Sequence, residues 1–439
     1  MYLIASYNLS KLQKGVIIGF ISFILIFTSI YYITRLNETK IDSSSSDDDT
    51  TTITIEPEEI IPKGIRLTFI YNYNDSIVIS WYTEKNATDP NVIYSINPDL
   101  SSATKIKPNS TQITSTTYIY HAELVNLWPN TTYHYQVSSD VNNKREIMNF
   151  TTLANKNVSN ITFLVYGDSR TNRLERAVLV EKIMEQFKDE FEFIVHTGDI
   201  VESGTYQYEW NNYFSDTETL NAFKQGVYAE GNHEGGSSTK MYDNLLMYGN
   251  QSNRYYYFTY GGVGFIILNS NKEFDTTYND AQTDWLNDTL DQLSQENTFN
   301  FAFMHHPLLH SRSYDYHREH WRPLFDKYNV SVIFCGHNHH YERSYPMTNS
   351  SKLDYDDSEL YDYVNLNNSI YIVTGGAGAP LYSVYSYNFI AEKEEAYHFV
   401  LVDVKKEPAK TTVSLESWGM PIDFGNLYLI DNITLTKFN

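Results

Sequence analysis

The stretch VSVIFCGHNHHYERSYP, residues 330–346, decides how this chain is organised. A mainly apolar run ends at Gly336 and is followed at once by His337, His339 and His340. Eight of the thirteen histidines lie between positions 305 and 340. Because imidazoles gathered at the carboxyl end of a buried strand can hold a metal ion, the pattern predicts a strand, a turn and a metal site. The rest of the chain must then supply oxygen ligands.

The same arrangement, an apolar run that ends in polar residues, recurs earlier in the chain. The segments are VYGDSR, HTGDIVES, YAEGNHEGG and FMHHPLLHS, and their polar side chains include Asp168, Asp199, Asn232, His233 and His305. Open α/β sheets place binding sites outside the carboxyl ends of their strands, so we expect these residues to meet. A mixture of carboxylate, amide and imidazole suits first-row transition metals better than calcium, which prefers oxygen ligands. A carboxylate such as Asp199 can bridge two ions about 3.5 to 4 Å apart.

From residue 160 onward, buried strands alternate with amphipathic helices. Residues 161–166 and 191–197 are predicted strands, and residues 173–188 between them form a predicted helix with one apolar face. This is βαβ organisation. Later helices are expected at 280–294 and 317–328, and later strands at 299–304, 330–335, 370–374, 397–404, 412–417 and 427–437.

Residues 63–153 have a different pattern, in which short β-rich runs are separated by clusters of Asn, Asp, Pro and Ser. This spacing is typical of a small β-sandwich. No constellation of polar residues stands out in this region, so we interpret it as a packing domain.

The five polar clusters, in this order, resemble the calcineurin-like metallophosphoesterase superfamily. The motifs GNHE, HxP and GHxHxYERSYP resemble its purple acid phosphatase branch, and SWYT at 80–83, HAELVNLWPNTTYHYQV at 121–137 and FTT at 150–152 resemble the fibronectin-III-like amino-terminal domain of that branch. The resemblance covers residues 63–439. It implies an α/β catalytic domain over 158–439, an αββα sandwich of two mixed sheets, preceded by the all-β fibronectin-III-like sandwich.

The resemblance also implies two metal ions, for which Fe, Zn and Mn are the candidates. Their ligands form two sets that share Asp199. The first ion is assigned Asp168, Asp199 and His339, and the second is assigned Asn232, His305 and His337. His233 would face the substrate.

Two positions depart from the family pattern. Purple members have a tyrosine three residues after the bridging aspartate, where this chain has Glu202, and other branches have a histidine where this chain has Arg170. The first ion therefore lacks one expected ligand, and no tyrosinate-to-iron colour is expected. Glu202 could supply an oxygen ligand or could point to solvent. Arg170 could bind a phosphate oxygen or could be a solvated loop residue.

Other histidines are candidates for lesser roles. His310 and His317 follow the HxP motif where the family has substrate-facing histidines, although the loop differs in length, and we take both as catalytic candidates. The remaining polar residues near the motifs are interpreted as packing groups or as groups that orient ligand imidazoles. They are His196, Glu234, His306 and His340.

The amino-terminal segment predicts attachment to a membrane. Residues 16–34 contain no charge and are long enough to cross a bilayer at about 1.5 Å per residue. We expect a cytosolic tail at 1–15, an uncleaved transmembrane signal anchor at 16–34 and a flexible stalk at 35–62. A cleaved signal peptide, which would give a secreted protein, is the alternative. The charges on the two sides of the anchor are nearly balanced, so they do not decide its orientation. The many N-x-S/T sequons do, because they predict N-linked glycans on an extracellular or lumenal body. This body would lie at the cell surface or in endosomes or lysosomes.

The overall charge restricts the class of partner. The chain has 54 acidic and 32 basic residues, a formal charge of -22, which argues against binding nucleic acid through a basic surface. Phosphate recognition should therefore be local. The single cysteine, Cys335, allows no intrachain disulfide and is interpreted as a small core residue.

Together these features predict a binuclear metal-dependent phosphohydrolase, similar to acid phosphatases, that acts on small-molecule phosphate monoesters. Metal-bound hydroxide would attack directly, because coordination lowers the pKa of water toward about 7. His233, with His310 or His317, would stabilise the phosphoryl oxygens and protonate the leaving alcohol. Two alternatives stay open. The same fold and ions could cleave a phosphodiester or pyrophosphate bond, or the chain could be an inactive phosphatase-like cell-surface glycoprotein.

Overall fold

The computed structural model describes residues 59–69, 75–155, 158–234, 239–246, 254–271, 276–309, 315–349 and 354–438. The predicted tail, the predicted membrane anchor at 16–34 and nearly all of the predicted stalk lie outside these residues. Among the residues that the structure describes, no helix is long and apolar enough to cross a bilayer.

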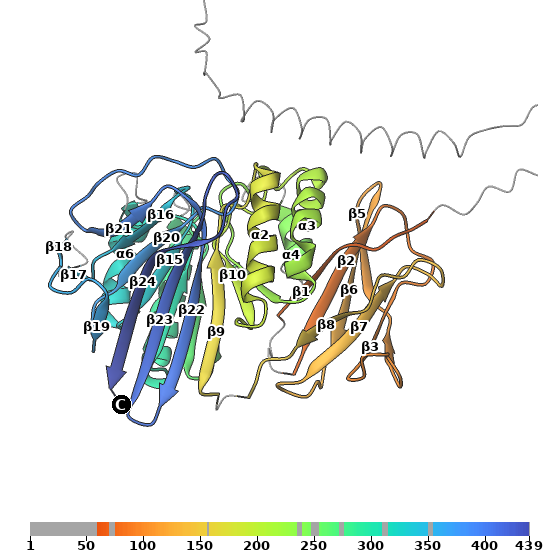
Figure 1. Ribbon diagram of the computed structural model, residues 1–439, viewed down its shortest axis with the longest axis horizontal. Helices are drawn as coiled ribbons and strands as arrows, with labels where there is room; N and C mark the ends of the chain where they lie inside the picture. The colour runs from red at the N-terminus through yellow and green to blue at the C-terminus, as the bar shows by residue number, and fades with distance from the viewer. Residues whose placement is uncertain are drawn as a thin grey trace, which may run out of the picture. The chain divides into compact units, whose positions relative to one another are not determined.

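The first described part of the chain is the expected β-sandwich, drawn on the right of Figure 1. Its strands are β1 (Lys63–Thr68), β2 (Ile77–Thr83), β3 (Asn91–Ser95), β4 (Thr104–Ile106), β5 (Asn109–Thr114), β6 (Thr117–Leu124), β7 (Thr132–Ser138) and β8 (Met148–Thr151). β1, β2, β6 and β5 form one layer, and β4, β3, β7 and β8 form the other. Trp81 and Tyr120 stack in the core of the sandwich with ring centroids 5.3 Å apart. The strands β4 and β5 were not predicted, because their side chains are mostly exposed and polar.

The sandwich and the α/β part share one sheet. β11 (Gln225–Tyr228) pairs in parallel with β1, so that Leu67 lies opposite Gln225 and Thr68 opposite Gly226. An 11-stranded sheet therefore continues from the sandwich into the α/β part. This pairing satisfies backbone groups that an open edge of β1 would leave unpaired. The sequence pattern had suggested two separate domains and did not predict the shared sheet.

Two mixed sheets form the α/β part. The remaining strands of the larger sheet are β9 (Asn160–Tyr166), β10 (Phe193–His196), β19 (Asp362–Val364), β22 (Tyr397–Glu407), β23 (Lys410–Met420) and β24 (Tyr428–Phe438). The second, 7-stranded sheet consists of β12 (Tyr256–Tyr260), β13 (Val263–Ile267), β14 (Phe299–Phe303), β15 (Val332–Cys335), β16 (Tyr341–Ser344), β20 (Ile370–Thr374) and β21 (Ile390–Glu394). A separate pair is formed by β17 (Met347–Asn349) and β18 (Asp354–Tyr355).

The central strands are buried on both faces. In β9, Ile161, Phe163 and Val165 belong to the core between the two sheets, whereas Leu164 and Tyr166 pack in the core under the helices. Successive side chains of a strand point to opposite faces, so a strand covered on both sides is apolar throughout. This is why the buried strands were visible in the sequence as continuous apolar runs.

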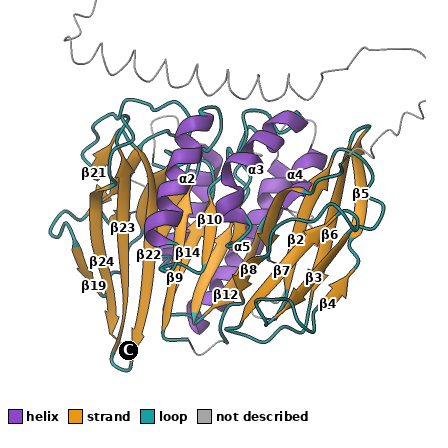
Figure 2. Ribbon diagram, turned by 45° about the vertical axis from the view of Figure 1, so that its right-hand side comes forward, coloured by secondary structure: helices purple, strands orange, loops and turns teal. Residues whose placement is uncertain are grey.

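Helices cover the outer face of each sheet, as Figures 1 and 2 show. Leu179 of α2 (Arg173–Phe187) packs on the larger sheet, as does Tyr213 of α3 (Gln207–Asn221) next to α4 (Thr239–Leu246). Leu290 of α5 (Thr276–Glu296) and Phe325 of α6 (Asp315–Lys327) pack on the second sheet. The layers are therefore helix, sheet, sheet, helix, the expected α/β architecture. Neither α3 nor α4 was predicted, because α3 is rich in polar residues and buries Thr217 and Asn221 on its inner face.

Candidate metal centre

The predicted ligands meet where the parallel strands of both sheets end. Asp168 follows β9, Asp199 follows β10, and His337 follows β15, and all three have left-handed backbones, with φ of 56°, 52° and 69°. Such a conformation costs a non-glycine residue of order 1 to 3 kcal/mol, so surrounding contacts must enforce it. The neighbouring glycines leave the necessary room. A Cβ atom at Gly231 would lie 2.1 Å from the backbone nitrogen of Asp199, and one at Gly336 would lie 2.4 Å from Asp168 Oδ2.

Four of the ligand residues, Asp199, Asn232, His305 and His337, converge on one point, and we call them the four-ligand cluster. Asn232 Oδ1 is 3.0 Å from His305 Nε2 and 3.0 Å from His337 Nδ1. His305 Nε2 is 3.3 Å from His337 Nδ1 and 3.2 Å from Asp199 Oδ1. Ligand atoms that bind one ion at about 2.0 to 2.2 Å are themselves separated by about 3 to 3.5 Å. These residues therefore fit a transition-metal ion.

A hydrogen bond to the backbone sets the orientation of the His305 ring. Its Nδ1 donates to the backbone oxygen of Thr197 at 3.0 Å, which leaves Nε2 directed at the cluster. Burial lowers the pKa of His305, but the charges of Asp199 and Asp168 outweigh burial and raise this pKa to about 9. The surrounding carboxylates thus stabilise a positive charge at this point, whether a proton or a metal ion supplies it.

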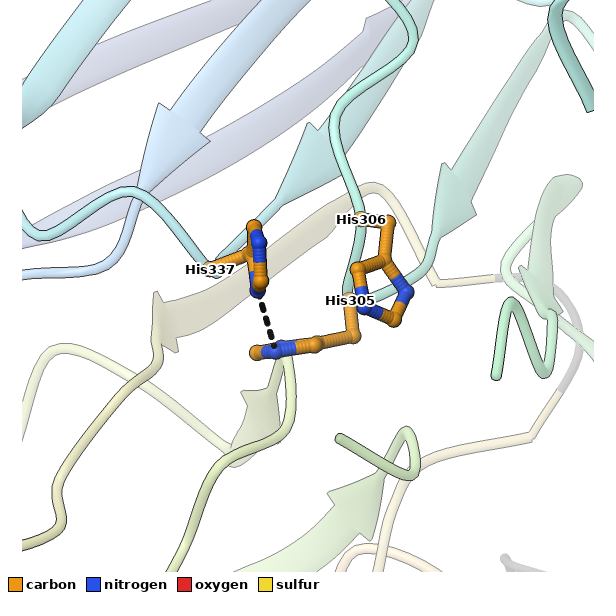
Figure 3. Close-up of side chains that lie close together, drawn as sticks. All are labelled: His305, His306 and His337. Carbon is orange, nitrogen blue, oxygen red and sulfur yellow. Dashed lines mark hydrogen bonds between the residues drawn. The ribbon is translucent and has the colours of Figure 1, made fainter. Parts of the chain in front are cut away.

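A third imidazole supports the ligand rings. Figure 3 shows His306 beside His305 and His337, and its ring centroid lies 4.7 Å from that of His305 and 4.6 Å from that of His337. His306 Nδ1 lies 2.8 Å from the hydroxyl of Ser270. Burial and the neighbouring histidines hold the pKa of His306 well below its ordinary value. Neutral and packed against both ligands, His306 has the orienting position expected from the sequence.

Glu234 fixes the backbone that carries the ligands. Its buried carboxylate accepts hydrogen bonds from the backbone N–H groups of Asp199 at 3.0 Å, Ile200 at 2.9 Å, Val201 at 3.1 Å and Gly231 at 3.0 Å. One side chain therefore joins the loop after β10 to the loop after β11. The sequence suggested that Glu234 packs near the site or orients a ligand imidazole, and the structure shows its carboxylate bound to backbone groups.

The side of the centre that was assigned to the first ion has a different character. Asp168 accepts the backbone N–H of His337 at 3.0 and 2.8 Å, and its Oδ1 lies 3.5 Å from His339 Nε2. His339 Nδ1 donates to the backbone oxygen of Pro380 at 2.7 Å, so its Nε2 is the nitrogen that faces inward. Arg170 also lies here. We call Asp168, Arg170, Glu202 and His339, together with the shared Asp199, the Arg170 cluster.

Glu202 is exposed and pairs with Arg170. Its Oε2 accepts hydrogen bonds from Arg170 Nη1 and, at 2.5 Å, from the hydroxyl of Thr171. Its side chain is 44% exposed, at the rim of the centre. Glu202 is therefore partly exposed to solvent, as one of its two sequence interpretations expected, and its carboxylate is directed at Arg170.

The predicted catalytic residues separate into those near the ligands and those elsewhere. His233 Nδ1 donates to the backbone oxygen of Glu202 at 2.6 Å, and His233 Nε2 lies 3.7 Å from Asp199 Oδ2. His317, in contrast, is buried in α6 with its ring 4.1 Å from that of Trp321, and burial lowers its pKa to about 3. Its helix packs the ring of His317 against Trp321, and His317 is not among the residues that line the cavity over the centre. His310 lies outside the described residues.

Two further histidines have the packing positions that the sequence suggested. His196 is buried, with Nε2 2.9 Å from the hydroxyl of Ser169, and burial lowers its pKa to about 3. His340 is buried beside Glu342, with 3.4 Å between its Nε2 and the carboxylate.

A cavity of about 810 Å³ opens over the centre. The ligand residues line one part of it, and a tyrosine-rich segment after β20 lines another. Tyr382 of this segment stacks on His339 with ring centroids 3.9 Å apart. Sequence reasoning missed these aromatic residues, although the run LYSVYSY after the glycine-rich loop is a visible signal. The residues lining the cavity from this segment are Leu381, Tyr382, Ser383, Tyr385 and Tyr387.

Two mixed sheets with a ligand set gathered at their carboxyl ends define a metallophosphoesterase fold. More particularly, residues 161–341 match the family Calcineurin-like phosphoesterase, and residues 62–152 match the family Purple acid Phosphatase, N-terminal domain. The chain therefore combines a calcineurin-like phosphoesterase domain with a purple acid phosphatase N-terminal domain. The resemblance that the motifs indicated is confirmed.

Individual relatives agree with this assignment. An uncharacterized protein of Mycobacterium tuberculosis (strain ATCC 25618 / H37Rv) is 23% identical over 85% of this chain and 87% of its own length. Probable inactive purple acid phosphatase 1 of Arabidopsis thaliana is 25% identical over 60% of this chain and 49% of its own length. Among solved structures, purple acid phosphatase PPD1 from yellow lupin (Lupinus luteus) seeds has a TM-score of 0.71 at 19% identity, covering 86% of this chain and 75% of the lupin chain. PhoD has a TM-score of 0.61 at 14% identity, covering 88% of this chain and 94% of its own. At these identities the structures show the shared fold.

Proposed function

We propose that the chain is a metal-dependent phosphohydrolase that acts on small-molecule phosphate monoesters. The observation that carries the proposal is the four-ligand cluster, whose ligand atoms lie 3.0 to 3.3 Å apart. Asp199, Asn232 and His337 of this cluster also line the cavity of about 810 Å³, so a substrate could reach the ion. A metal bound there acts as a Lewis acid and lowers the pKa of water toward about 7.

The chain's own residues would bind the phosphoryl group and manage the proton. Arg170 lines the cavity, and a guanidinium can donate two parallel hydrogen bonds to phosphate oxygens. His233 donates from Nδ1 to the backbone oxygen of Glu202, which leaves its Nε2 on the side of Asp199 and the cavity. From there His233 is placed to give a proton to the leaving alcohol. Water is the nucleophile in this proposal, and no phosphoenzyme forms.

One observation favours a second candidate function, a protein that binds a phosphate ester without hydrolysing it. Arg170 pairs with Glu202 on the side of the centre assigned to the first ion, and this pair replaces ligands found in the family. The Arabidopsis relative carries the description probable inactive. Binding without turnover would follow if the centre lacked the charge needed to stabilise the transition state.

The test is metal content together with turnover on the purified full-length chain. We expect metal-loaded protein to hydrolyse phosphate monoesters and metal-stripped protein to lose this activity and regain it when metal returns. Phosphodiesters and pyrophosphates in the same panel, from acid to neutral pH, test the other bond types that the ligand set allows. A metal-loaded chain that binds the monoester without turnover would favour the second function. A chain that retains no metal would refute the first.

We also propose that the part of the chain that follows the predicted membrane anchor lies outside the cytosol and carries N-linked glycans. Eight sequon asparagines of the described residues are exposed, as glycan attachment requires. They are Asn86, Asn109, Asn130, Asn149, Asn160, Asn329, Asn367 and Asn432. Treatment of the cell-derived protein with an N-glycosidase should increase its gel mobility. Unchanged mobility would contradict the proposed location.

A further inference from the structure

Arg170 lies where the resemblance places the first metal ion. Its side chain is 12% exposed and extends from the loop after β9 toward the ligands. Its Nε is 3.5 Å from Asp199 Oδ2, and its Nη2 is 3.4 Å from His339 Nε2. The guanidinium therefore faces two of the three residues assigned to that ion.

The atoms that Arg170 faces are the ones that a first ion would need. His339 donates from Nδ1 to the backbone oxygen of Pro380, so its inward Nε2 has the lone pair free for a cation or a donor. Asp199 turns Oδ1 toward His305 and Oδ2 toward Arg170. The carboxylate thus has the orientation of a bridging ligand, with the four-ligand cluster on one side and the guanidinium on the other.

A second carboxylate, that of Glu202, also fixes the position of Arg170. Glu202, at the position of the family's ligand tyrosine, accepts a hydrogen bond from Arg170 Nη1. The carboxylates of Asp199 and Glu202 contact the guanidinium, that of Asp168 lies near it, and an arginine side chain stays protonated in proteins. The guanidinium is therefore a permanent cation among three carboxylates.

We propose that the guanidinium of Arg170 takes the place of the first metal ion, so that the chain binds one ion, at the four-ligand cluster. The proposal rests on the proposed function, in which that cluster is a metal site. A divalent ion and this guanidinium cannot both lie between Asp199 and His339, because the guanidinium nitrogens already lie 3.5 Å from Asp199 Oδ2 and 3.4 Å from His339 Nε2, the two atoms that the ion would need. Arg170 then supplies the second positive charge against the phosphoryl oxygens without a second metal.

The experiment is metal stoichiometry of the purified full-length chain. Wild type and variants are saturated with Zn²⁺ or with Mn²⁺, desalted and measured by plasma mass spectrometry, and the number of sites is measured independently by calorimetric titration. We expect one ion per chain for wild type and for Arg170→Lys, which keeps the positive charge. Arg170→His removes the permanent charge and adds an imidazole beside Asp168, so we expect two ions per chain.

Arg173→His is the matched control. Arg173 lies nearby at the start of α2, but it pairs with Asp216 at 3.0 and 2.7 Å and is not among the residues that line the cavity. We expect this variant to hold one ion, as wild type does. Near-ultraviolet circular dichroism of each variant shows whether it has kept the native fold, and the wild-type ratio is informative even if a variant does not fold.

The outcomes separate this proposal from the proposed function. Two ions per wild-type chain would overturn the proposal that Arg170 takes the place of a metal ion, but the proposed metal-dependent hydrolysis would stand. A folded Arg170→His variant that still holds one ion would overturn it too. A wild-type chain that retains no ion would overturn the proposed function and this inference together.

Discussion

The four-ligand cluster and the Arg170 cluster lie side by side at the same strand ends and share the carboxylate of Asp199. In the first, four side chains turn ligand atoms to within 3.3 Å or less of their neighbours. In the second, Asp168 and His339 have similar support from the backbone, but a guanidinium lies against His339 and Asp199. The scaffold thus offers two places for positive charge at these strand ends, and the guanidinium of Arg170 lies in one of them.

The largest effect is expected from Asp199→Ala, because Asp199 belongs to both clusters. Loss of its carboxylate removes a metal ligand and one partner of Arg170, so metal retention and hydrolysis should fall together, activity by at least about a thousandfold. Parallel assays of metal content and turnover check this prediction. The exposed Asp189 gives a matched control, since Asp189→Ala should change neither quantity. Wild-type turnover in Asp199→Ala would remove this residue from the centre.

His337→Ala and His339→Ala compare the two clusters directly. His337 Nδ1 is part of the four-ligand cluster, so its removal should abolish metal retention and reduce turnover about a hundredfold or more. His339 Nε2 faces Arg170 and Asp168, so its removal should leave one ion bound and cost about tenfold. Equal loss of metal in the two variants would show that the clusters are not distinct.

Glu234→Gln tests the support that serves both clusters. An amide offers one acceptor oxygen where the carboxylate now accepts four backbone N–H groups, and its own N–H₂ would oppose some of them. We expect a loss of about 2 kcal/mol or more in the free energy of unfolding, with weaker metal binding, measured by chemical denaturation and titration. Glu181→Gln, on the exposed side of α2, should leave both unchanged. A Glu234→Gln variant as stable as wild type would contradict the support assigned to this carboxylate.

Glu202→Gln should have the smallest effect. Glu202 is 44% exposed, and ion pairs near the surface contribute about 0 to 1 kcal/mol, so the loss of this partner should loosen Arg170 and lower kcat/KM a few-fold at most. The number of bound ions should not change. A Glu202→Gln variant that loses metal would instead make Glu202 a ligand, which its contacts with Arg170 and Thr171 argue against.

Much of the centre could be predicted from the chain because each ligand has a local signature. Asp168, Asp199 and His337 each follow a continuous apolar run and stand next to a glycine, and both features are visible without a structure. The strands themselves were visible because they are buried on both faces. Some elements remained hidden because they are polar or partly exposed, such as α3 and the strand β5, where side-chain periodicity carries little signal. The strand β13 was also missed, although its side chains are apolar and buried.

Other features are not local at all. The pairing of β1 with β11 joins residues more than 150 positions apart, as in Leu67 and Gln225, and depends on how the two layers meet. The prediction for His317 followed a family expectation, but in the structure its buried ring packs against Trp321 and it is not among the residues that line the cavity. The tyrosines that line the cavity become part of the centre only because the loop after β20 returns to His339.

The sequence by itself determined which residues could hold a metal and that they stand at strand ends, since both depend on neighbours within a few positions. Only the tertiary structure decided which atoms face one another. The contacts of Arg170 join it to Glu202, 32 residues away, and to His339, 169 residues away. Such contacts depend on the packing of loops from different strands. The pattern alone therefore left Glu202 as a ligand or a solvated residue and Arg170 as a phosphate binder or a loop residue. The fold places the two side chains in contact, beside Asp199 and His339.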